Sequence, residues 1–163
     1  MDTKVLDSIL LDKRKFIETF TLIANKSQEL VPFVLNKAQL DFHTRSGQRS
    51  IILKARQLGF SSYILASMLH EALTKPNTNC VCISHEEKST KRLFARLQMM
   101  YESIPTKYKL IAEHQSSYEL VFERINSQIF IGTARAPVFG RGDTINILHL
   151  SELDHYPEGK AEE

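Results

Sequence analysis

The chain has 163 residues, 42% of them hydrophobic and 25% charged, and its 21 Lys and Arg against 19 Asp and Glu give a net charge of +2. This size and composition are typical of one globular domain and exclude collagen-like, disordered and disulfide-scaffold proteins, while the small net charge does not by itself indicate nucleic-acid binding. No apolar run approaches the ~20 residues of a transmembrane helix, and the two cysteines, Cys80 and Cys82, are interpreted as core residues of a protein from a reducing cytoplasm.

The first predicted element is a helical segment over residues 3–30, in which apolar positions recur at three- and four-residue spacing. Its charge cluster at 12–15 is either a break between two helices or a solvated helix face, and we favour the solvated face. Pro32 ends this segment, since proline disfavours helix at the residue before it. A short helix over 36–45, closed by Gly47, follows.

Short apolar runs then alternate with amphipathic helices. Strands are predicted at 50–55, 80–83 and 145–150, a β-hairpin at 118–123 and 128–132, and helices at 61–73 and, after a capping box, from 84–87 onward. Such alternation is typical of an α/β fold with a largely parallel sheet covered on both faces.

The segment between the predicted strand at 50–55 and the next helix has features of a phosphate-binding loop. Its residues are Lys54-Ala55-Arg56-Gln57-Leu58-Gly59-Phe60-Ser61-Ser62. A loop in this position turns backbone N–H groups toward a phosphate, helped by the positive end of the helix dipole.

This loop departs from the G-x-x-x-x-G-K-[ST] pattern known as Walker A, because Lys54 replaces the first glycine and Phe60 the lysine. Lys54 and Arg56 would supply the cationic charge instead, and Ser61 the hydroxyl for Mg²⁺. The alternative is an ordinary strand-to-helix turn, in which glycine provides a positive φ and Ser61 or Ser62 caps the helix.

A second candidate motif, similar to Walker B, is the apolar run at 147–150 followed by Ser151 and Glu152. Phosphoryl transfer depends on positioning and charge neutralisation, so an acid at the tip of a strand beside the phosphate loop is a candidate to activate water. Ser151 takes the metal-proximal position and Glu152 that of the catalytic base. The alternative is a strand end with a solvated acidic turn.

Together, the segments at 54–62 and 148–152 resemble the large subunit of the DNA-packaging terminases of tailed bacteriophages, over about residues 31–157. The resemblance implies a P-loop NTPase fold, a three-layer sandwich with a mainly parallel and possibly incomplete sheet. The ATPase core would span residues 31–163, after an N-terminal helical segment over 1–30.

The resemblance also implies an activity and its partners. The expected activity is ATP hydrolysis with Mg²⁺, coupled to moving double-stranded DNA into a procapsid. The expected partners are the terminase small subunit and further copies of the chain, in a ring on the portal. The place of action would be the host cytoplasm, with no membrane.

Roles for single residues follow from the same resemblance. Residues 54–62 would bind ATP, with Lys54 and Arg56 on its phosphates. The Mg²⁺ ligands would be Ser61, Ser151 and Glu152, and Glu152 would also be the catalytic base.

Two further residues have open alternatives. Gln39 matches the family's adenine-reading glutamine, although Asn36 and Gln39 also form a capping-box pattern. Arg141 matches an arginine finger for a neighbouring subunit, although it is equally suited to an ion pair with Asp143, and Arg135 is the second candidate.

The family has further parts after the acidic strand: a coupling motif, more strands and a nuclease domain. Only residues 153–163 follow Glu152 here. We therefore expect a fragment of a longer motor that hydrolyses ATP poorly by itself.

Two other functions remain open at this stage. One is a metal-dependent nuclease built on His149, Glu152, Asp154 and His155. The other is a non-catalytic DNA-binding module using Lys88, Lys91, Arg92 and Arg96, which otherwise form a solvated helix face. The remaining histidines, among them His85, lack metal-ligand spacing and are interpreted as surface or helix-face residues.

Overall fold

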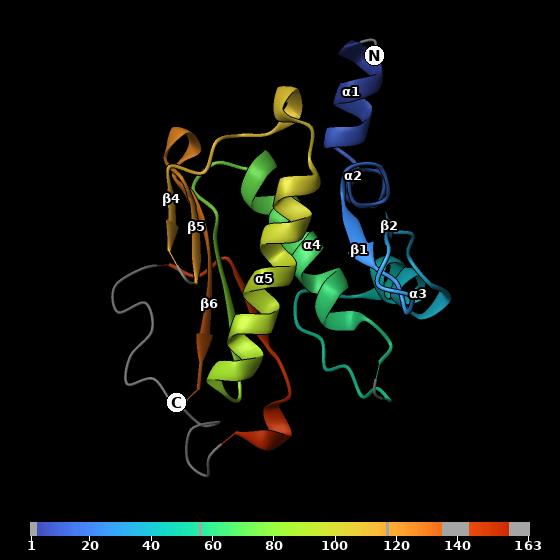
Figure 1. The fold of residues 1–163 in the computed structure, drawn as a ribbon, viewed down its shortest axis with the longest axis vertical. Helices are drawn as coiled ribbons and strands as arrows, with labels where there is room; N and C mark the ends of the chain where they lie inside the picture. The colour runs from blue at the N-terminus through green and yellow to red at the C-terminus, as the bar shows by residue number, and fades with distance from the viewer. Residues whose placement is uncertain (1–2, 56, 117, 135–143, 157–163) are drawn as a thin grey trace.

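The computed structural model describes residues 3–55, 57–116, 118–134 and 144–156 (Figure 1). Its centre is a five-stranded sheet in the order β4-β5-β6-β3-β7. These strands are β3 (Asn79–Ser84), β4 (His114–Ser116), β5 (Glu119–Phe122), β6 (Ser127–Thr133) and β7 (Ile147–Leu150). β3 is parallel to both β6 and β7, and β5 is antiparallel to both β4 and β6. Among the described strands of this sheet β5 alone thus runs opposite to the others, so the sheet is mainly parallel.

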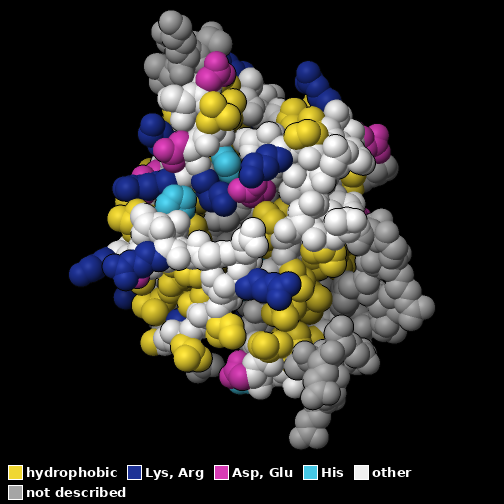
Figure 2. Space-filling model, turned by 180° about the vertical axis from the view of Figure 1, so that it is seen from behind, with side chains coloured by type: hydrophobic (Ala, Val, Ile, Leu, Met, Phe, Trp, Pro, Cys, Tyr) yellow, Lys and Arg dark blue, Asp and Glu magenta, His cyan; other side chains and the backbone are white. Residues whose placement is uncertain are grey.

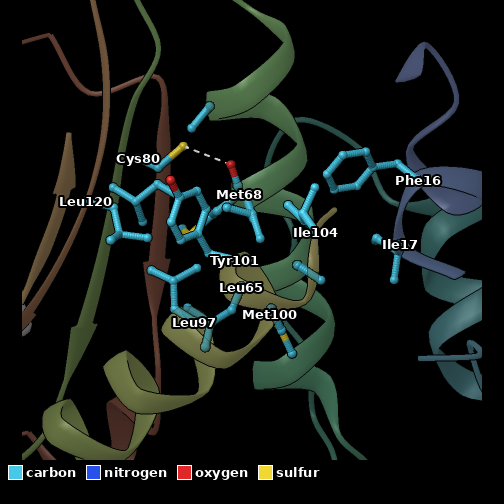
Figure 3. Close-up of a cluster of buried hydrophobic side chains, with 14 of the residues drawn as sticks. Phe16, Ile17, Leu65, Met68, Cys80, Leu97, Met100, Tyr101, Ile104 and Leu120 are labelled. Carbon is cyan, nitrogen blue, oxygen red and sulfur yellow. Dashed lines mark hydrogen bonds between the residues drawn. The ribbon is translucent and has the colours of Figure 1, made fainter. Parts of the chain in front are cut away.

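Two long helices, α4 (Phe60–Thr74) and α5 (Glu87–Ser103), cover one face of this sheet. Cys80 of β3 lies with its Sγ 3.8 Å from the Met68 carbonyl on α4, and the Tyr101 ring of α5 packs against Phe122 of β5 at 5.8 Å. Figure 3 shows the buried side chains that meet between these elements. Among the described helices, none lies on the second face of the sheet, where the other layer of the expected sandwich would be.

The two cysteines belong to this core. Cys80 and Cys82 are free and buried, and burial raises the pKa of each thiol to about 12. Their interpretation as core residues is therefore confirmed.

The N-terminal segment consists of two helices, α1 (Thr3–Leu10) and α2 (Lys13–Phe20). Asp12 separates them, because its side chain accepts a hydrogen bond from the Lys15 N–H at 2.9 Å and caps α2. The favoured solvated-face interpretation of residues 12–15 was wrong, and the alternative of a helix break is confirmed.

Residues 21–30 are not helical, contrary to the prediction for 3–30. They form most of an antiparallel ribbon between β1 (Leu22–Ala24) and β2 (Leu30–Pro32). The turn between them is closed by Asn25, whose side chain accepts from the Glu29 N–H at 3.0 Å, with Gln28 at φ 64°. The backbone hydrogen bonds between β1 and β2 therefore determine the structure of residues 21–30, where the helix prediction depended on few apolar residues. The ribbon links residues on both sides of the expected boundary at residue 30.

The predicted strand at 50–55 is absent, and these residues have no regular secondary structure. Ile51 and Leu53 are 93% and 97% exposed. A strand forms only where a sheet edge pairs with it, and within the described part of the chain this segment pairs with none. Further hydrophobic side chains are exposed to solvent on the face of the molecule that is turned away from the viewer in Figure 1, as Figure 2 shows.

The capping box predicted at 84–87 is also absent, although the helix α5 itself is confirmed. Glu86 is the N-cap residue and makes no side-chain cap. The Ser84 hydroxyl instead donates to the Glu86 carbonyl at 3.0 Å and lies 2.7 Å from the Thr90 hydroxyl.

The remaining predicted elements are confirmed. They are α3 (Lys37–Arg45), α4, β3, β7 and the β5–β6 hairpin, whose turn contains η2 (Glu123–Ile125) and Asn126 at φ 51°. The short strand β4 and the helical turns η1 (Thr106–Tyr108) and η3 (Leu153–His155) were not predicted. None of the described helices combines the length and the apolar character needed to cross a membrane.

Candidate functional site

The candidate phosphate loop enters α4 through a tight turn. Gln57 and Gly59 both adopt left-handed backbone conformations, with φ of 65° and 71°. Gly59 is the N-cap residue of α4 and no side chain caps this end. The alternative of an ordinary turn is therefore confirmed in the positive φ of its glycine and wrong in its capping serine, Ser61 or Ser62. The first N–H groups of the helix are thus left without a side-chain acceptor, and a helix N-terminus in this state favours an anion.

The side chain of Gln39, on α3, is hydrogen-bonded to this turn. Its side chain is almost completely buried, and its Nε2 donates to the Gly59 carbonyl at 3.0 Å. Its Oε1 accepts from the Asn36 N–H at 3.0 Å, which completes a capping box at the start of α3. The capping-box interpretation of Asn36 and Gln39 is confirmed, and adenine reading by Gln39 stays a prediction.

The candidate acidic strand ends next to β3. The Ile83 carbonyl at the end of β3 accepts from the Ser151 N–H at 2.8 Å and from the Tyr156 hydroxyl at 2.7 Å. Burial raises the pKa of Tyr156, which keeps its hydroxyl available as a donor. Glu152, between these two anchors, has φ 60° and precedes η3.

The Glu152 carboxylate turns toward the residue that follows β3. Its Oε2 lies 2.9 Å from Nδ1 of His85, and the rings of His85 and His155 are 5.4 Å apart. The sequence interpretation had placed His85 among surface residues and missed this contact. The available signal was its position directly after β3, since the carboxyl ends of adjacent parallel strands meet at one edge of a sheet.

Lys54 connects the two candidate motifs electrostatically. The pKa of His149, on β7, is lowered to about 4, first by burial of the ring and then by the positive charge of Lys54. The cationic start of the loop therefore acts on the strand that leads to Glu152.

Three candidate cations lie outside the described residues. They are Arg56, Arg135 and Arg141. The arginine-finger role of Arg141 or Arg135, the Arg141–Asp143 alternative and the phosphate contact of Arg56 therefore stay predictions.

No group of three or more His, Cys, Asp or Glu side chains in the described ranges is arranged to hold a metal ion. The nuclease alternative, which needed His149, Glu152, Asp154 and His155 to converge, has no support from the structure. Mg²⁺ typically binds through one or two carboxylates together with substrate phosphates and water. The half-exposed Glu152 carboxylate and the hydroxyls of Ser61 and Ser151 are oxygen donors of the kind that such a shared ion uses.

The basic face of α5 is partly engaged. Lys91 pairs with Glu87 at 2.8 Å, and burial lowers the pKa of the half-buried Arg96. These contacts favour the helix-face interpretation of Lys88, Lys91, Arg92 and Arg96 over a dedicated DNA surface.

A polar cavity of about 430 Å³ lies at the opposite end of the sheet, where β3 and β6 begin. Its lining includes Asn77, Asn79, Asn126 and Gln128. Open α/β sheets bind ligands beyond the carboxyl ends of their strands, so this cavity is not the candidate site.

The described part of the chain forms an α/β protein with a mainly parallel sheet and two long helices on one face of it (Figure 1). One solved structure that the chain resembles is the large terminase of bacteriophage HK97, with a TM-score of 0.71 and 19% identity over 86% of this chain and 30% of that chain. This likeness confirms the predicted α/β fold with a mainly parallel sheet, and it agrees with the resemblance to terminase large subunits. The chain spans less than a third of the length of that structure. No family model and no curated protein matches the sequence.

Proposed function

We propose that this chain is the ATP-hydrolysing part of a viral DNA-packaging motor. The observation that carries the proposal is an uncapped α4 N-terminus together with an acid, Glu152, that follows the end of β7, on a fold shared with a phage large terminase. The positive charge of Lys54 lowers the pKa of His149 on β7, which supports a short distance between the candidate phosphate loop and the candidate acidic strand.

In this proposal the triphosphate lies over the first turn of α4. The backbone N–H groups after Gly59 donate to its oxygens, and Lys54 and Arg56 contribute positive charge. The buried amide of Gln39 keeps the turn in the shape that this contact requires. Ser61, Ser151 and Glu152 would hold a Mg²⁺ ion shared with the nucleotide, which would supply charge neutralisation at the phosphates.

Hydrolysis in this proposal is an in-line attack of water on the γ-phosphorus. The bond from the water oxygen to phosphorus forms while the bond to the β–γ bridging oxygen breaks, and a Glu152 carboxylate oxygen accepts the proton of the water. Arg141 of a neighbouring copy, with Arg135 as the second candidate, would add charge in the transition state. In the wider proposal, copies of the chain form a ring on the portal in the host cytoplasm, bind the terminase small subunit and move double-stranded DNA. The whole protein would also contain a nuclease domain.

The experiment that tests this function replaces Glu152 by glutamine. Because a positioned general base contributes ~10²–10⁴-fold, we expect Glu152→Gln to lower the rate of ATP cleavage by at least ~10²-fold and to leave nucleotide affinity nearly unchanged. Cleavage is measured under single-turnover conditions with the chain in excess, and affinity with a fluorescent ATP analogue.

Asp154→Asn is the matched control, because this exposed acid lies in the same turn. We expect it to behave like the unmodified chain. If Glu152→Gln loses affinity together with cleavage, Glu152 has a structural role and the proposed mechanism is wrong.

A further inference from the structure

The backbone around Glu152 is held in an uncommon conformation. A φ of 60° is rare for a residue with a side chain and persists only where the surroundings fix it. Here the same acceptor, the Ile83 carbonyl, holds Ser151 on one side of Glu152 and Tyr156 beyond η3 on the other. The position from which the Glu152 side chain leaves the backbone is therefore tied to the end of β3.

The side chain beyond this point is half exposed, and His85 is the basic group at ion-pair distance from it in the described part of the chain. The 2.9 Å between Nδ1 of His85 and Oε2 of Glu152 is short enough for a hydrogen bond, although the two groups are not aligned as one in this structure. Catalytic contacts of this kind are often poorly aligned before substrate binds.

The imidazole of His85 is itself restrained. Its side chain is only 20% exposed, and its Nε2 lies 3.6 Å from Oε1 of Glu86, the N-cap residue of α5. Its ring also packs against the ring of His155, which follows Glu152 in η3. His85 is thus placed by contacts with the N-cap residue of α5 and with η3, rather than by its own rotamer preference alone.

We propose that His85 is a positioning residue for Glu152, an inference that rests on the function proposed above. Nδ1 of His85 holds one carboxylate oxygen, Oε2, and leaves Oε1 free to accept the proton of the attacking water. A half-exposed glutamate without such a partner samples several rotamers, and a misplacement of ~1 Å can cost about 10²-fold in rate.

The contact can be tested without turnover. In the full chain labelled with ¹⁵N, the imidazole resonances of His85 are compared between the unmodified protein and Glu152→Gln at one fixed pH. We expect the His85 resonances to shift and those of His70 to stay in place, because Nε2 of His70 donates to the Leu10 carbonyl at 2.9 Å, where α4 packs against the end of α1. Unchanged His85 resonances would overturn the inference.

The role in the reaction is tested by kinetics. We expect His85→Ala to lower kcat for ATP by ~10–100-fold with little change in KM, as is typical when the partner of a reacting group is removed. His85→Asn, which keeps a donor, should recover part of this loss. Asp154→Ala is the control in the same turn and should keep the unmodified rate.

An unchanged kcat in His85→Ala, or a rise of KM alone, would show that His85 does not orient the base, and the inference would fail. Failure of the proposed function has a different signature, which is no ATP cleavage by the unmodified chain. In that case the NMR measurement alone tests the inference. A shift of the His85 resonances in Glu152→Gln supports the contact between His85 and Glu152, and unchanged resonances overturn it.

Discussion

Gly59 is the residue on which the geometry of the candidate loop depends most directly. Its φ of 71° lies in the left-handed region, and a Cβ at this position would lie 2.8 Å from Nε2 of Gln39. Two constraints, the backbone conformation and the close approach of the Gln39 amide, thus favour glycine here. The sequence pattern could predict the first constraint, but the second depends on α3, which reaches the turn from elsewhere in the chain.

Replacement of Gly59 by alanine should therefore destabilise the protein by ~1–2 kcal/mol and displace the Gln39 amide. The measurement is urea-induced unfolding. Gly47→Ala is a matched control, because a Cβ at Gly47 meets nothing within 4 Å. We expect a change within about 0.5 kcal/mol for the control. Equal effects of the two substitutions would show that the turn tolerates a side chain.

The residue scale also shows what sequence alone could not supply. Glu152 was predicted as the acid at a strand tip, and its position after β7 is confirmed. Its partner His85 was missed, because the contact depends on the parallel pairing of β7 with β3. Catalysis by Glu152 itself stays a prediction.

Among the elements, the packing of α2 on α4 joins the N-terminal helices to the core. The Phe16 ring meets the His70 ring at 5.1 Å, and Lys13 Nζ lies 2.8 Å from Glu71 Oε1. His70 is buried, and its Nε2 lies 2.9 Å from the Leu10 carbonyl. Burial lowers the pKa of His70 below its ordinary 6.5, with the charges of Lys13 and Lys75 acting in the same direction.

This packing should make stability depend on pH. Because the folded state keeps His70 neutral, acidification below 6.5 protonates the unfolded chain first, and the free energy of unfolding falls as pH falls. We expect His70→Phe, which keeps an aromatic ring beside Phe16, to flatten this dependence by at most about 1.4 kcal/mol per pH unit. Urea unfolding at several pH values between about 7.5 and 5 measures it. An identical slope in both proteins would contradict a neutral, buried His70.

The elements differ in how far the sequence determined them. The helices α3, α4 and α5 and the strand β3 were predicted from local sequence patterns, and in α5 the apolar spacing agrees with the face that the helix buries. The β1–β2 ribbon and the irregular segment at 50–55 were not, because a strand is defined by its partner. The apolar pattern of residues 50–55 does not reveal whether a free edge is available to them.

For the whole molecule, the mainly parallel sheet brings the carboxyl ends of β3 and β7 to the same edge. Leu148 and Leu150 of β7 remain 53% and 39% exposed, on the face that the described helices leave open. The likeness to a phage large terminase covers 86% of this chain, so the fold extends beyond the two motifs that first indicated it.

Binding of the triphosphate at the N-terminus of α4 is measured by backbone amide chemical shifts during titration with Mg²⁺ and a non-hydrolysable ATP analogue. We predict the largest shifts at Gly59, Phe60, Ser61 and Ser62, with smaller ones at Ser151 and Glu152. Shifts confined to the opposite end of the sheet, around Asn77, Asn79 and Gln128 of the polar cavity, would contradict the account.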